Sequence, residues 1–215
     1  MSIDAVTAPA NRSTDGAPVD HEVVVIGAGM AGMYQIKRLM DLGVDALCLE
    51  RDADLGGTWY KNRYPGARAA TESYTYGYSF SKELLNEWHW KERFSAQPEN
   101  LRYLNYVADK FGLRKFMRFN LKVEAAVFDE ASHLWRLRLD DGFELTCRFV
   151  ILAVGLLAIP TLPRLEGMEA FKGRADHTFH WPHEPVELAG KKVGIIGTGA
   201  TAFQVMGEIA DKVGE

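Results

Sequence analysis

The chain has 215 residues, of which 47% are hydrophobic and 25% are charged, and its formal net charge is −4. This is an ordinary globular composition, and without a long basic stretch it argues against a nucleic-acid partner. Cys48 and Cys147 are the only cysteines and neither belongs to a CxxC pair, which argues against both a disulfide framework and a zinc site.

The first twenty residues have neither a basic region nor an apolar run, so residues 1–20 are expected to be a disordered tail and not a signal peptide. The longest apolar run, residues 149–160, is too short to span a bilayer. Together with the isolated thiols, these features predict a soluble, cytoplasmic protein that has no membrane partner.

The first element predicted along the chain is a buried parallel strand at Val23–Ile26, a continuous run of branched apolar residues. A helix follows, with Met33 and Ile36 at helical spacing, and Gly43 is expected to end it. The segment 45–50 then predicts a second strand. The order of strand, glycine-rich turn, helix and strand is typical of a dinucleotide-binding unit.

Between that strand and helix, Gly27, Gly29 and Gly32 form a GxGxxG motif, and Glu50 ends the next strand. Gly27 permits the tight turn, Gly29 lets the main chain approach a pyrophosphate, and Gly32 allows the helix to pack on the strand. Glu50 stands where an acid accepts ribose hydroxyls. Two alternatives stay open: the glycines serve packing alone, and Glu50 is a solvated charge.

A long loop rich in glycine and aromatic residues follows, from residue 51 to residue 73, and its length favours a functional role. Within it, Gly57 offers another close backbone approach, Thr58 a hydroxyl group and Trp59 a flat aromatic face. This set suits a long ligand with an aromatic ring system. The alternative for Trp59 is a hydrophobic anchor of the loop.

Two helices are predicted next, one over residues 81–94 with Ser81 as N-cap and one from Pro98 to just before Gly112. From residue 121 to residue 155 the pattern changes to short alternating runs, with a hairpin signal at 140–142. This part predicts an antiparallel β-meander.

The opening pattern returns near the end of the chain: an apolar run at 192–196 predicts a strand, and a GxGxxA motif precedes a predicted helix. Two dinucleotide motifs suggest two dinucleotides, most simply a nicotinamide cofactor that delivers hydride to a flavin. Only the start of this second βαβ unit is present. The chain is therefore expected to be the N-terminal part of a longer protein.

The segment 171–182, FKGRADHTFHWP, stands between the meander and the second motif. It suggests a core patch, a metal site or a link between two nucleotide-binding halves. His177, His180 and His183 are spaced three apart, but Pro182 and Pro185 would interrupt a helix that placed them on one face. This disfavours a metal.

With these motifs in this order, the chain resembles a type I Baeyer–Villiger monooxygenase. The fingerprint of that family, FxGxxxHxxxWP, is complete here in Phe171, Gly173, His177, Trp181 and Pro182. The resemblance implies an α/β fold: a Rossmann-like FAD-binding domain with an inserted antiparallel β-meander (21–160), a linker (161–190) and the start of a second Rossmann-like, NADP-binding domain (191–215). In the family, His177 and Trp181 would help relay domain movement and cofactor position.

The resemblance also implies the cofactor contacts. FAD would be bound by Gly27, Gly29, Gly32, Glu50, Arg51, Gly57, Thr58, Trp59, Tyr76 and Val123, and NADPH by Arg68, Gly197, Thr198, Gly199, Ala200 and Thr201. It implies that NADPH reduces FAD, that O₂ then gives a peroxyflavin, and that this converts a small-molecule ketone to an ester or lactone.

Position 70 departs from the family pattern, because Ala70 stands where the family usually has an aspartate beside the flavin. Alanine cannot hold the later active-site arginine with which that carboxylate pairs. Ala70 and the incomplete second βαβ unit favour one alternative to ketone oxidation, a non-catalytic FAD-binding fragment. The other alternative is a flavin monooxygenase that acts on nitrogen or sulfur, because such relatives share both glycine motifs and a similar linker. The Trp181–Pro182 ending favours ketones, because nitrogen- and sulfur-oxidising relatives usually lack it.

Overall fold

The computed structural model of the chain describes residues 19–214, so the predicted tail lies outside the described residues except for its last two positions. The described chain forms two compact units. The first comprises the residues up to Gly57 together with Ala108–Leu156, and the second comprises Thr58–Val107 and the residues from Leu157 onward.

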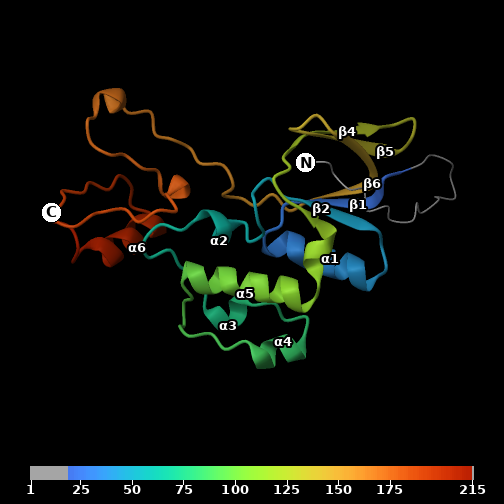
Figure 1. Ribbon diagram of the computed structural model, residues 1–215, viewed down its shortest axis with the longest axis horizontal. Coiled ribbons are helices and arrows are strands. Elements are labelled where there is room, and N and C mark those ends of the chain that lie inside the picture. The colour runs from blue at the N-terminus through green and yellow to red at the C-terminus, as the bar shows by residue number, and fades with distance from the viewer. Residues whose placement is uncertain (1–18, 215) are drawn as a thin grey trace. The chain divides into compact units, whose positions relative to one another are not determined.

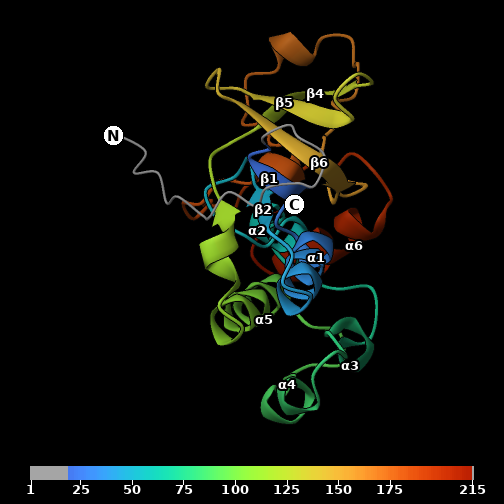
Figure 2. The same ribbon diagram turned by 90° about the vertical axis from the view of Figure 1, so that its right-hand side faces the viewer.

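The first unit is built on a single six-stranded sheet with the order β3–β2–β1–β6–β5–β4 (Figures 1 and 2). Strands β1, β2, β3 and β6 run parallel, whereas β4 and β5 form the antiparallel part. The bounds are β1 His21–Ile26, β2 Ala46–Leu49, β3 Met117–Arg118, β4 Val123–Asp129, β5 Leu134–Leu139 and β6 Glu144–Leu152. The predicted mixed α/β architecture is thus confirmed.

Strand β6 joins the predicted meander to the parallel sheet. Its first half pairs antiparallel with β5, and its second half pairs parallel with β1. Cys147 lies at the changeover, because it is paired with Trp135 on one side and His21 on the other. The meander is therefore continuous with the nucleotide-binding sheet, and Figure 2 shows β4, β5 and β6 side by side.

Buried aliphatic side chains hold this sheet together. One such group, called the sheet cluster below, consists of Val24, Leu49, Leu137, Leu139, Leu145 and Cys147. Helix α1, Met30–Asp41, buries Met33 and Ile36, as its spacing predicts. The helix ends as expected, because Gly43 adopts a φ of +68° and its N–H binds the carbonyl of Met40.

Most of the other helices belong to the second unit. They are α2 Thr58–Lys61, α3 Ser73–Tyr76, α4 Lys82–Glu87, α5 Gln97–Lys110, which continues into the first unit, α6 Ala200–Ile209, and the short 3₁₀ helices η2 Met168–Ala170 and η3 Thr178–His180. A third 3₁₀ helix, η1 Leu113–Phe116, lies in the first unit. Over residues 19–214 no helix combines the length and the apolar character needed to cross a membrane.

The helix predicted over residues 81–94 is correct at its start and wrong at its end. The Ser81 side chain accepts from the N–H of Leu84 at 3.2 Å, as an N-cap does, but α4 ends at Glu87. The next residues pack aromatic rings on α5: the ring centroids of Trp88 and Trp90 lie 5.2 and 4.8 Å from that of Tyr103. This packing outweighs the helical preference of the segment.

The strand predicted at 192–196 is not formed, and the residues that precede α6 are irregular. A β-strand depends on a neighbouring strand for its hydrogen bonds, and none of the described strands pairs with this segment. Ile195 and Ile196 remain 37% and 79% exposed. The predicted strand at 192–196 is therefore wrong, because none of the described strands lies beside this segment to share hydrogen bonds with it.

We expect Leu137→Ala to lower the free energy of unfolding by about 2–5 kcal/mol, because it opens a cavity in the sheet cluster of the first unit. Leu85→Ala on α4 is the matched control, since Leu85 is 49% exposed. Urea unfolding followed by circular dichroism measures both variants. Equal losses would show that Leu137 is not in a packed core.

The two thiols should be unreactive in the folded chain. Burial, with a smaller effect from Glu50, raises the pKa of Cys48 from 9.0 to about 12, and burial raises the pKa of Cys147 to about 11. Because both values are raised, the stability that the neutral thiols contribute is complete below pH 9 and is lost as the pH rises toward 11–12.

Alkylation at pH 8, followed by mass spectrometry, should therefore modify both thiols far more slowly in the native chain than in urea. Unfolding curves at pH 8 and pH 10 should show the lower stability at pH 10. Native labelling as fast as that in urea would contradict the burial of these thiols.

Candidate functional site

The first glycine turn connects β1 to α1, and packing demands two of its glycines. Gly27 has a φ of +105°, and a Cβ atom there would lie 2.6 Å from the carbonyl oxygen of Ala153. A Cβ atom on Gly32 would lie 1.8 Å from the carbonyl oxygen of Gly27. The roles expected for Gly27 and Gly32 in the turn and in helix–strand packing agree with this geometry.

Gly29 differs from these two glycines. It is the N-cap of α1, with φ −77° and ψ −170°, a conformation open to any residue. A Cβ atom on it would make an ordinary contact of 3.5 Å with the Cα atom of Gly57. Packing within the chain therefore does not require glycine here. The missing side chain would permit a close approach to the N-terminus of α1.

The loop that contains Gly57 lies directly against this turn. The N–H of Gly56 donates to the carbonyl of Ala28 at 3.0 Å. Gly57 has a φ of +52°, and a Cβ atom on it would lie 2.9 Å from the Cα atom of Gly29. Two segments of main chain without side chains thus meet beside the N-terminus of α1.

Glu50 is not a solvated charge at a strand end. It is 6% exposed, and its carboxylate accepts from the N–H of Ala28 at 2.7 Å and from the N–H of Asp52 at 2.9 Å. These bonds fix the carboxylate beside the glycine turn. Each carboxylate oxygen has a second lone pair with which it could accept from a ribose hydroxyl.

The other FAD candidates are distributed over both units. Trp59 is buried, its indole N–H donates to the hydroxyl of Tyr76 at 2.7 Å, and the two rings meet edge to face. Burial raises the pKa of Tyr76, so this phenol stays neutral. This burial fits the alternative interpretation of Trp59 as an anchor of its loop, and FAD binding by Trp59 stays a prediction. Arg51 and Thr58 are exposed, and Val123 packs at the edge of the sheet cluster.

The second glycine turn repeats the backbone of the first. Gly197 has a φ of +125°, and Gly199 caps α6 with φ −78° and ψ 177°, close to the values of Gly29. In both cases the helix begins directly after the capping glycine and has no acidic residue in its first turn. Both helix N-termini are therefore suited to anions. This conformation forms even though the preceding strand does not.

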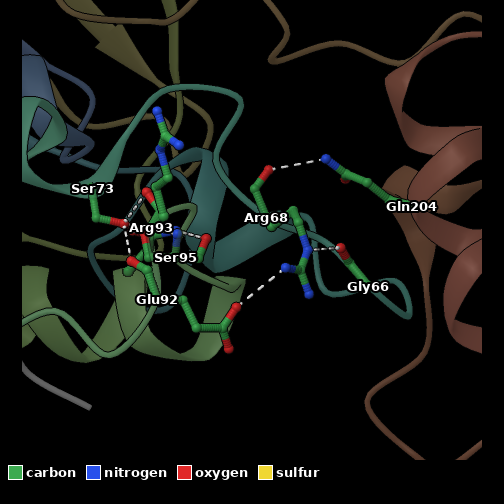
Figure 3. Close-up of polar contacts among 8 residues, drawn as sticks. Gly66, Arg68, Ser73, Glu92, Arg93, Ser95 and Gln204 are labelled. Atoms are coloured by element: carbon green, nitrogen blue, oxygen red, sulfur yellow. Dashed lines mark hydrogen bonds and ion pairs between the residues drawn. The ribbon is translucent and has the colours of Figure 1, made fainter.

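Arg68 lies beside α6 in the second unit. As Figure 3 shows, its guanidinium group bonds Glu92 at 3.2 Å and the carbonyl of Gly66 at 3.4 Å, while its own carbonyl accepts from the side chain of Gln204 at 3.2 Å. The structure thus brings Arg68 next to α6, whose first residues are Ala200 and Thr201, although Arg68 and these two NADP candidates are far apart in the sequence.

Sequence reasoning missed the contacts that make this arrangement. The Tyr64 hydroxyl donates to the Gln204 side chain at 2.9 Å and lies 3.4 Å from the hydroxyl of Thr201. Gly66 has a φ of +78°, and a Cβ atom on it would lie 2.3 Å from the carbonyl oxygen of Gln204. The Pro65–Gly66 dipeptide is a turn signal that could have drawn attention to this position.

The segment 171–182 forms an ordered connection. Phe171 is 62% exposed, so it is not part of a core patch, and its ring covers Gly173, where a Cβ atom would lie 2.6 Å from a ring carbon. The His177 ring caps η3 by accepting from the N–H of Phe179 at 3.1 Å, and Trp181 and Pro182 follow that helix. The His177 ring is therefore part of the local structure at η3.

The contacts of His183 also fit a connecting role for this segment. Its Nδ1 lies 2.6 Å from the Arg63 guanidinium group, in the same loop as Tyr64 and Gly66. Among residues 19–214, no three side chains of the metal-binding types come together.

The chain is similar to proteins of known activity over most of its described length. It is 45% identical over 197 residues to a Baeyer–Villiger monooxygenase of Pseudooceanicola batsensis, covering 91% of this chain and 36% of that protein. It is 42% identical over 191 residues to the phenazine N-monooxygenase PhzNO1 of Lysobacter antibioticus, covering 88% and 35%. The chain thus spans about a third of the length of the curated relatives it matches.

A solved structure and a family model agree with these relatives. The crystal structure of OTEMO in complex with FAD and NADP superimposes with a TM-score of 0.86 at 44% identity, over 92% of this chain and 38% of that one. The model of the family described as flavin-binding monooxygenase-like matches residues 20–214. The chain therefore belongs to the flavin-binding monooxygenase-like family.

Proposed function

We propose that this chain contributes the FAD-binding and NADPH-binding turns of a Baeyer–Villiger monooxygenase, which converts a ketone to an ester or lactone with O₂. The observation that carries the proposal is the pair of glycine turns, Gly27–Gly32 and Gly197–Ala202, which share one backbone conformation and flank a complete FxGxxxHxxxWP fingerprint. The proposal includes the domain bounds 21–160, 161–190 and 191–215.

The first turn suits the pyrophosphate and ribose of FAD. The main chain is bare at Gly29 and Gly57, and the N-terminus of α1 attracts phosphate there. The carboxylate of Glu50 is held by two backbone N–H groups and would accept from a ribose hydroxyl. When bound, FAD would supply hydride acceptance and oxygen activation, and these residues would hold and orient it.

The second turn suits the phosphates of NADPH. The described residues leave open space around Gly197 and Gly199, where a Cβ atom would meet nothing within 4 Å. Arg68 supplies a cation close to α6, and its ion pair with Glu92 is exposed on both sides. Because such exposed pairs contribute little, the guanidinium group could exchange Glu92 for a phosphate.

A second candidate function is N-oxygenation. It is supported by the 42% identity to a phenazine N-monooxygenase. The reaction would use the same two cofactor turns, so these turns do not separate the two candidates. A cytoplasmic location is also part of the proposal, in keeping with two free cysteines.

Gly29→Ala and Gly32→Ala should separate cofactor binding from folding. We expect Gly29→Ala to fold normally and lose FAD, because its methyl group contacts only Gly57 at an ordinary distance yet occupies the phosphate surface. Gly32→Ala should destabilise the fold itself, since its Cβ would overlap the Gly27 carbonyl.

Flavin absorbance per purified chain and the thermal midpoint measure these two effects. A Gly29→Ala chain that keeps its flavin would contradict the proposed phosphate site.

The reaction class is tested by supplying the chain with FAD, NADPH and air, and offering a cyclic ketone, a thioether and an aromatic N-heterocycle in parallel. Mass spectrometry of the products should show a lactone one oxygen atom heavier than the ketone. Turnover of the heterocycle or thioether alone would support the second candidate. Flavin retention without any product would indicate a cofactor-binding fragment that requires further chain for turnover.

A further inference from the structure

A single side chain, Gln204, joins the Arg68 loop to α6 with both ends of its amide. Its oxygen accepts from the hydroxyl of Tyr64 at 2.9 Å, and its nitrogen donates to the main-chain carbonyl of Arg68 at 3.2 Å. Figure 3 shows the second of these bonds reaching from the helix to the loop. A side-chain amide with donor and acceptor both engaged on one loop fixes the position of that loop along the helix axis.

The main chain of the loop lies so close to α6 at Gly66 that no side chain would fit between them. Gly66, between the two residues that Gln204 bonds, would place a Cβ atom 2.3 Å from the Gln204 carbonyl oxygen and 3.2 Å from the side chain of Glu208. Gln204 therefore contacts the loop with both its side chain and its main chain. Tyr64 extends the contact to Thr201, in the first turn of α6.

The opposite edge of the loop is held independently. The N–H of Gln97 donates to the carbonyl of Ala67 at 2.7 Å, and the N–H of Ala69 donates to the carbonyl of Ser95 at 2.9 Å. The segment that makes these bonds, residues 92–97, is itself held by the buried Ser73 hydroxyl. This hydroxyl donates to the carbonyls of Glu92 and Arg93 and accepts from the N–H of Ser95 (Figure 3). On the α6 side, the side-chain links among the described contacts are the two bonds of the Gln204 amide and the hydroxyl contact between Tyr64 and Thr201.

We infer that Gln204 is a positioning residue, which holds the main chain of Arg68 at a fixed place beside α6 and so sets the affinity for the nicotinamide dinucleotide. This inference rests on the proposed function for the role of the dinucleotide. The main chain of Arg68 is bound, whereas its guanidinium group has an exposed partner in Glu92. The side chain can therefore turn toward a phosphate without movement of the loop.

The test uses Gln204→Met, which keeps the length of the side chain and removes both hydrogen bonds of the amide, and Tyr64→Phe, which removes the bond to the amide oxygen together with the hydroxyl contact to Thr201. Met206→Gln is the matched control, because Met206 lies on the same helix and is 43% exposed. Hydrogen–deuterium exchange of residues 62–70, in the whole chain without cofactor, measures how firmly the two Gln204 bonds hold this loop, an interaction called the clamp below. Calorimetric titration with NADP⁺ measures affinity, and flavin absorbance measures FAD retention.

We expect deuterium uptake in residues 62–70 to rise in Gln204→Met, less so in Tyr64→Phe, and not in Met206→Gln. The dissociation constant for NADP⁺ should rise about tenfold in Gln204→Met, the effect expected from two lost hydrogen bonds. FAD retention should stay unchanged, because the glycine turn and Glu50 lie in the first unit.

Unchanged uptake in residues 62–70 of both test variants would overturn the clamp. Raised uptake with an unchanged dissociation constant would overturn its role in affinity. If the wild-type chain bound no NADP⁺, the proposed function would lose its nicotinamide cofactor and the affinity role would fall with it, while deuterium uptake would still decide the clamp.

Discussion

The first unit depends on contacts between main-chain atoms that no side chain could accommodate. Gly27 meets the carbonyl of Ala153 at the end of β6, and Gly32 in α1 meets the carbonyl of Gly27. Through these two contacts the helix, the first strand and the returning strand come within backbone distance of one another. The N-terminus of α1 can then point along the carboxyl edge of the sheet, where α/β folds bind their ligands. Glu50, at the end of β2, faces the same turn because its strand runs parallel to β1.

The chain uses a similar device a second time at Gly66. There the partner is the carbonyl of Gln204 in α6, and the close approach brings a cationic loop to the helix of the second glycine turn. Helix N-termini offer an anion a partial positive charge, and a nearby guanidinium group adds a full one. The two turns thus share their backbone but differ in the charged residue nearby: the carboxylate of Glu50 bonds the first turn, and Arg68 lies beside the helix that begins at the second.

Features that depend on local chemistry were predictable from the sequence. The glycine turns, the end of α1 at Gly43, the N-cap at Ser81 and the hairpin at 140–142 all follow from conformational preferences of a few adjacent residues. The outcomes that were missed depend on distant partners. Helix α4 ends early because Trp88 packs on Tyr103, and the apolar segment at 192–196 is not a strand because no strand adjoins it. The contact of Gln204 with Arg68 joins residues 136 positions apart, and neither residue shows it in its own sequence context.

The change of partner within β6 has a consequence for how proteins with this sheet can vary in length. Residues of β6 before Cys147 are in register with β5, and those after it are in register with β1. One inserted residue on either side of Cys147 would move the side chains of that half of β6 to the opposite face of the sheet. The other half would keep its facing, so no shift of the whole strand could restore the register with both β5 and β1. Insertions should therefore accumulate at the turn around Gly142, where a Cβ atom would meet nothing within 4 Å, and be absent from the strand itself. Over evolutionary time, the hairpin turn can change in length, whereas β6 must keep the same number of residues.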